Sequence, residues 1–212
     1  MTVFLIVMTI ILVILLLLLL IPLTYKLLLR KYFKYFVNRK LYALSKEEDY
    51  LLVNELILDL SDDVCLHIDH ILCGDKFIYI VSDRYLFDAV EGSPEDDTFF
   101  LHKGKKRIEC KNSLKLNRRR AYLLSKYLNW HEGDPRIVVP ITVTNDKVKI
   151  DPNLKSMNGE EYIVHLKDLV KTIKQIEYDV SINVGAFDGK HLESLVAHIK
   201  ELDKQHKNTK EK

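Results

Sequence analysis

Residues 64–85 place an acidic side chain beside two strand-like runs. From 64 to 72 apolar and polar residues alternate, so the apolar side chains up to Leu72 share one face of a strand and Asp69 lies on the other. Residues 77–81 then run apolar without a break, which is typical of a strand buried on both faces. An aspartate at such a place is a common ligand for a divalent cation, which binds oxygen atoms. Asp69 is therefore the first candidate for site chemistry.

A second stretch of residues that could take part in binding is basic. Between residues 103 and 120 a single acid, Glu109, stands among nine cations, which are Lys103, Lys105, Lys106, Arg107, Lys111, Lys115, Arg118, Arg119 and Arg120. All 30 acidic residues follow residue 40, so the chain from residue 41 onward carries a formal charge of −4. A mildly acidic domain does not bind nucleic acid through its overall charge. The cluster therefore indicates a local phosphate-binding patch for nucleic acid or anionic lipid, with a solvated helix face as the alternative.

The N-terminal segment is a candidate membrane anchor. Residues 3–23 contain no charge and are dominated by Leu, Ile and Val, long enough to cross a hydrocarbon layer of roughly 30 Å as a helix. A cleaved signal peptide fits poorly, because no basic residue precedes the run and no small-residue cleavage site follows it. Six Lys and Arg residues lie between 26 and 40, so the positive-inside rule places the following domain in the cytoplasm. We expect a single-pass protein of the cell membrane, attached through residues 3–24.

The remaining pattern predicts an α/β domain with a mixed sheet. Ser45 and Glu48 resemble a capping box, and Leu52, Leu56 and Leu60 continue a helical stripe behind it. We expect helices at 46–60, 113–129, 167–177 and 190–205, strands at 64–72, 77–81, 86–90, 136–144 and 162–166, and a hairpin turning at 103–105. The predicted divisions are an anchor (1–24), a basic-aromatic linker (25–44), the main domain (45–178), a helical extension (179–206) and a disordered tail (207–212).

Four segments, taken in order, resemble a known family, and they are residues 68–72, 77–85, 112–114 and 138–145. Residues 68–72 (Ile-Asp-His-Ile-Leu) are similar to the I-D-H segment of the nuclease-related domain (NERD) family of the restriction-endonuclease-like superfamily. Residues 112–114 (Asn-Ser-Leu) resemble the start of its N-P-L-x-Q helix motif, and residues 138–145 resemble a later strand that often closes in Phe-Thr-Asn. The resemblance spans about residues 45–178 and implies a restriction-endonuclease-like mixed sheet flanked by helices, here preceded by one transmembrane helix.

The resemblance implies metal-dependent cleavage of phosphodiester bonds, but the matching positions depart from it. The family's Asp and the Glu of its E-x-K strand hold Mg²⁺. Asp69 falls on the Asp, whereas Val81 falls on the Glu, Asp83 on the Lys and Leu116 on the Gln of the helix motif. A valine cannot ligate Mg²⁺, which demands oxygen ligands.

Three functions follow as hypotheses. The first is a catalytically inactive NERD protein that binds nucleic acid or protein at the cytoplasmic face of the membrane. The second is a divergent Mg²⁺-dependent nuclease in which Asp69 and Asp83 are both metal ligands and catalytic residues. The third is a protein-interaction module without a nucleic-acid function.

Overall fold

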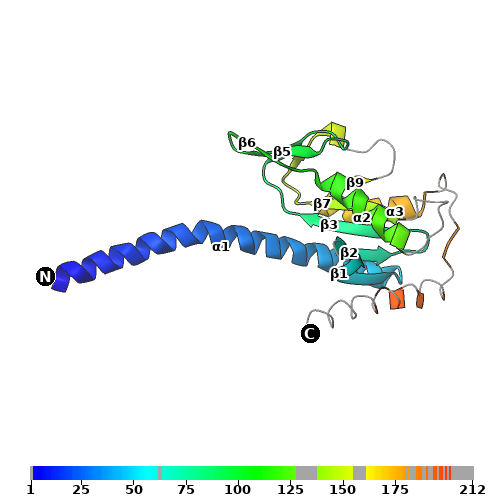
Figure 1. Ribbon diagram of the computed structural model, residues 1–212, viewed down its shortest axis with the longest axis horizontal. Helices are drawn as coiled ribbons and strands as arrows, with labels where there is room; N and C mark the ends of the chain where they lie inside the picture. Colours follow the sequence, from blue (N-terminus) through cyan, green and yellow to red (C-terminus); the bar gives the residue numbers. More distant parts are fainter. Residues whose placement is uncertain are drawn as a thin grey trace.

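The computed structural model describes residues 2–61, 64–127, 138–154 and 161–179, and beyond these residues 181, 185–187, 190, 193, 194, 196, 197, 199 and 201. A long N-terminal helix leads into a compact α/β body (Figure 1). The predicted ends at 128–129 and 136–137, most of the expected helix at 190–205 and the expected tail at 207–212 lie outside the described residues.

Helix α1 (Thr2–Glu47) belongs to the body in its second half. Phe33, Val37, Leu41 and Leu44 recur every three or four residues, so they face the same side of the helix, and all four are buried. They join the core formed with one face of the main sheet. The segment 25–44, expected as a linker, is thus a packed helical element, and a division at residue 45 cuts through the core.

The first half of α1 projects from the body (Figure 1). Large apolar side chains there are exposed, among them Phe4, Leu12 and Leu18. Among the described residues, no helix is both long enough and apolar enough to span a membrane. The expected transmembrane helix is therefore not supported.

The helix predicted at 46–60 is wrong. Ser45 does not cap a new helix, because its Oγ donates to the carbonyl of Tyr42 (2.9 Å) inside α1. The chain leaves α1 through Asp49, which has a positive φ of 56°, and forms strand β1 (Leu51–Ser61). β1 pairs antiparallel with β2 (Val64–Cys73) along almost its whole length. Leu52, Leu56 and Leu60 satisfy a helical period, but the pairing of β1 with β2 overrides it.

The main sheet is mixed, as predicted. Its order is β1-β2-β3-β7-β9, where β3 is Ile78–Arg84, β7 is Val138–Thr144 and β9 is Tyr162–His165. β2 runs antiparallel to both β1 and β3, whereas β3, β7 and β9 are parallel to one another. Helix α2 (Ser113–Tyr127) packs into the core on one face of the sheet, and α1 and α3 (Leu169–Glu177) pack into the core on the other.

A second, smaller sheet lies beside the main one (Figure 1). It has the order β6-β5-β4-β8, with β4 Ala89–Glu91, β5 Thr98–Lys103, β6 Lys106–Lys111 and β8 Lys149–Ile150. β5 and β6 form the predicted hairpin, and Gly104 takes a positive φ of 58° at its turn. The strand expected at 86–90 is reduced to β4. Short 3₁₀ turns at Pro152–Leu154 and Leu166–Asp168 complete the described elements.

The alternation predicted for β2 fails at Asp69. Leu66 and Ile68 share a core with Ile71, whereas Leu72 belongs to the other core. β1 changes faces at the same level, where Glu55 has a positive φ of 55°. The predicted common face up to Leu72 is therefore wrong, because a local backbone irregularity shifts the phase of both strands.

Candidate functional site

Asp69 lies in a small polar cluster between β2, β3 and α2. Its carboxylate is only 6% exposed and accepts a hydrogen bond from Ser82 Oγ at 3.0 Å. Arg84 Nη1 lies 3.6 Å from the same carboxylate oxygen, Oδ2. Arg120 Nη1 donates to Ser82 Oγ at 2.9 Å. The described neighbours of Asp69 thus include two guanidinium groups, one in direct reach and one through a serine.

The charge of this cluster is positive on balance. Burial lowers the pKa of Arg120, the nearby positive charge of Arg84 lowers it further, and the charge of Asp69 raises it. Two arginines therefore share one buried carboxylate. Such a group attracts an anion rather than a second cation.

Asp83 faces the other side of the sheet. Ser82 and Asp83 are neighbours on β3, so their side chains point to opposite faces, and Ser82 points toward Asp69. Asp83 Oδ2 lies 3.4 Å from Nε2 of His70, which is 1% exposed. The Nδ1 of His70 lies 2.7 Å from Asn54 Oδ1. Asp69 and Asp83 thus have different contact partners, although the charges of both act on Lys34.

Lys34 and Glu55 extend the polar region toward α1. Their side chains form an ion pair, and His67 lies 3.8 Å from both Glu55 and Asp69. Burial lowers the pKa of Lys34, but hydrogen bonding to Glu55 and the charges of Glu55, Asp83 and Asp69 leave it raised. Sequence reasoning did not bring Lys34 into the site, because it predicted a linker over the second half of α1.

The arrangement does not fit a Mg²⁺ centre. The described residues contain no group of three or more His, Cys, Asp or Glu side chains that could hold a metal ion. Asp69 is already engaged by Ser82 and Arg84, and Asp83 Oδ2 lies 3.4 Å from His70 Nε2. Mg²⁺ in proteins is usually held by one or two carboxylates together with waters, and here Arg84 already provides the counter-charge of Asp69.

Most of the nine predicted basic residues already have a partner. On the β5–β6 hairpin, Lys103 Nζ lies over the Phe87 ring (5.1 Å) and the Arg107 guanidinium over the Phe100 ring (3.6 Å). On α2, Lys115 pairs with Asp97 (2.6 Å) and Arg118 with Glu95 (2.9 Å), while Arg120 turns inward to Ser82. Among these nine residues, Lys105, Lys106, Lys111 and Arg119 are exposed and have neither an ion pair nor a ring contact within the described parts of the chain.

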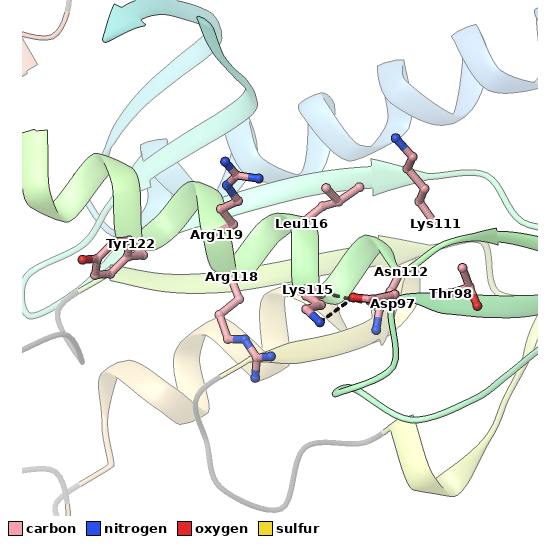
Figure 2. A pocket seen from close by; sticks show the side chains of 9 residues that line it. All are labelled: Asp97, Thr98, Lys111, Asn112, Lys115, Leu116, Arg118, Arg119 and Tyr122. Carbon is pink, nitrogen blue, oxygen red and sulfur yellow. Dashed lines mark hydrogen bonds and ion pairs between the residues drawn. The ribbon is translucent and has the colours of Figure 1, made fainter. Parts of the chain in front are cut away.

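The exposed cations of α2 border a shallow pocket of about 680 Å³. It is lined by Asp97, Thr98, Lys111, Asn112, Lys115, Leu116, Arg118, Arg119 and Tyr122 (Figure 2). Asn112 fixes its rim. The Oδ1 of Asn112 accepts from the Lys115 amide (3.1 Å) at the start of α2, and its Nδ2 donates to carbonyls of Ser93, Pro94 and Asp96.

Comparison with known protein families shows which family this chain belongs to. The family described as NERD, nuclease-related domain, matches residues 31–145, more than half of the 212 residues. The chain belongs to the NERD family. Searches of curated proteins and of solved structures give no match.

The NERD match begins within α1, consistent with the packing of Phe33 and Val37 into the core. It ends directly after β7, so it includes Asp69, the basic hairpin and α2. At the motif positions named above, Val81 is fully buried in the core and Leu116 is 40% exposed. Asn112 keeps a structural role as the cap of α2.

Proposed function

We propose that this NERD-family protein binds nucleic acid through its basic surface and does not cleave it. The observation that carries the proposal is the surroundings of Asp69. Arg84 and, through Ser82, Arg120 occupy its carboxylate, while Val81 is packed in the core where the resemblance implies the second metal ligand. A nuclease of this class needs a metal ion to polarise the phosphoryl oxygen and position water.

The same features favour binding of phosphate. Lys111, the last residue of β6, and Arg119 of α2 are exposed and line the pocket. Neither forms an ion pair within the described structure. Arg84 and Arg120 add positive charge next to Asp69. Contacts between such cations and phosphates release counterions, which is the main source of sequence-independent affinity for nucleic acid.

The test measures binding of labelled oligonucleotides to the full chain in detergent solution as the salt concentration is varied. Replacing Lys111 and Arg119 together by Ala should weaken binding, and for a single strand the log–log salt slope should fall by about 1.4. Lys171→Ala on α3 is the matched control, since Lys171 is equally exposed on an element that packs against the opposite face of the sheet. Equal binding by all three proteins would refute the proposal and favour the protein-interaction hypothesis.

Cleavage is tested in parallel with Mg²⁺ or Mn²⁺. We expect no cutting by the wild-type chain. Metal-dependent cutting that disappears in Asp69→Ala would overturn the non-catalytic part of the proposal and would revive a divergent nuclease.

We further propose that α1 attaches the domain to the cytoplasmic face of the cell membrane. The support is the exposed apolar surface between Phe4 and Leu18, followed by the cations from Lys26 to Lys40. After cell fractionation the full chain should sediment with membranes and resist extraction by high salt. A chain that stays in the soluble fraction would contradict this proposal without affecting the proposal on nucleic acid.

A further inference from the structure

The outer side of α2 alternates between cationic and apolar side chains. Leu116, Arg119, Tyr122 and Lys126 are spaced three or four residues apart, so they share one side of the helix, and all four are exposed. Leu116 and Arg119 point away from Lys115 and Arg118, which turn toward the loop carrying Asp97 (Figure 2). We call these four residues the α2 ridge.

Tyr122 stands out within the α2 ridge. Its side chain is 63% exposed, whereas the core beneath α2 is filled by Leu114, Ala121 and Leu124. Arg118 and Arg119 lie one turn before it and Lys126 one turn after it. Tyr122 therefore presents an aromatic surface between positive charges.

The charge around the pocket is suited to a polyanion. Asp97 is the single acidic residue among the described residues that line it, and Lys115 pairs with it at 2.6 Å. Arg118 is held by Glu95 at 2.9 Å, which leaves Arg119 and Lys111 facing solvent beside Leu116 and Tyr122. Cations that contact phosphates, interleaved with apolar and aromatic side chains that contact bases, are the pattern of single-strand binding surfaces.

We propose that the α2 ridge binds single-stranded nucleic acid, with an unpaired base stacked on Tyr122 and the flanking phosphates on Arg119 and Lys126. The inference rests on the proposed function and names its substrate class. A duplex cannot use Tyr122 in this way, because its base faces are already stacked inside the helix. A duplex can still contact the cations through its phosphates.

The experiment compares fluorescence anisotropy titrations of a labelled oligothymidine and of a duplex of equal length with the full chain in detergent solution. Tyr122→Ala should weaken binding of oligothymidine about tenfold, the usual effect of removing a stacking aromatic. It should leave duplex binding unchanged. Tyr122→Phe keeps the ring and should bind both probes as the wild type does.

Three outcomes separate this inference from the function on which it rests. A selective loss of oligothymidine binding in Tyr122→Ala supports the inference. Equal loss for both probes, or no loss, overturns it, while the proposed function still stands if Lys111→Ala/Arg119→Ala weakens both probes. A wild-type chain that binds neither probe overturns both.

Discussion

Asp69 shows how the neighbours of one carboxylate determine what it can do. A free aspartate at the edge of a cleft can hold a metal ion, whereas Asp69 is 6% exposed and accepts from Ser82 beside Arg84. A buried carboxylate next to a guanidinium gains a favourable charge interaction without a metal ion. Its role in this structure is to hold positive charge in place.

A substitution of Asp69 distinguishes the two roles by the sign of its effect. Asp69→Asn removes the negative charge between Arg84 and Arg120, so nucleic acid should bind more tightly, by about threefold at low salt for a partly screened charge. The measurement is an oligonucleotide titration, with circular dichroism to confirm folding. A metal ligand would give the opposite result, since Asp69→Asn would then abolish Mg²⁺-dependent binding and cleavage.

Glu177 is a second buried carboxylate, and its role is structural. It is 1% exposed, and it accepts from Tyr79 Oη and from the Lys76 amide (2.5 Å). A Cβ on Gly74 would lie 2.7 Å from a Glu177 carboxylate oxygen. The positive-φ residues of the described chain do not include Gly74, so the close approach of Glu177, rather than backbone conformation, explains the glycine.

The buried state of Glu177 predicts a pH effect on stability. Burial raises the pKa of Glu177 above its ordinary value of 4.5, although the hydrogen bonds from Tyr79 and Lys76 oppose this shift. The folded protein thus keeps the proton to higher pH than the unfolded chain, and stability falls as pH rises from about 4.5 through the folded pKa. Glu177→Gln has no proton to lose and should flatten this decline in urea denaturation midpoints. Parallel pH profiles for the two proteins would contradict the assignment.

At the scale of elements, α2 is positioned by two asparagines. Asn112 begins the helix and binds the loop before β5, as described above. Asn117 Nδ2 donates to the carbonyls of Ile80 (3.1 Å) on β3 and Ile141 (3.2 Å) on β7. These bonds lie where Pro140 has no amide hydrogen to give to the ladder between β3 and β7. α2 is therefore attached to the sheet by polar contacts as well as by its apolar face, which fixes the direction of the α2 ridge.

Substitutions of Asn112 should separate its two tasks. Asn112→Ala loses the cap and the three bonds from Nδ2, and should destabilise the protein by about 2–3 kcal/mol. Asn112→Asp keeps an oxygen for the cap but loses the donors, so it should retain part of that stability. Chemical denaturation gives the values, with Ser113→Ala as the control. Equal stability of Asn112→Ala and the control would show that the loop does not depend on Asn112.

At the scale of the whole molecule, the two halves of α1 differ in their surroundings. Its second half completes the core on one face of the main sheet, and its first half extends away with apolar side chains exposed (Figure 1). Lys40 Nζ also donates to the Leu166 carbonyl (2.9 Å), and Lys174 of α3 pairs with Glu47 (2.8 Å). The domain therefore cannot be separated from α1 at residue 45 without opening its core.

The difference in burial between the two halves of α1 gives a stability prediction for two leucines of this helix. Leu41 is fully buried, and Leu41→Ala should destabilise the domain by about 3 kcal/mol through lost burial and a residual cavity. Leu28 is 49% exposed, so Leu28→Ala should change little. Both values come from urea denaturation of the full chain in detergent solution. If the two variants are equally stable, the second half of α1 is not part of the folding unit.

The sequence by itself predicted the mixed sheet, strands β2, β3, β7 and β9, the β5–β6 hairpin and helix α2, because their periodicity and turn residues are locally unambiguous. It also carried the ordered motifs of the NERD family. It did not predict β1, since Leu52, Leu56 and Leu60 fit a helix until β2 is available for pairing. Nor did it show that Asp69 and Asp83 have different contact partners, that Arg84 and Arg120 converge near Asp69, or that α1 completes the core. Local sequence reports which side chains need burial, whereas strand pairing and helix docking decide which charges meet.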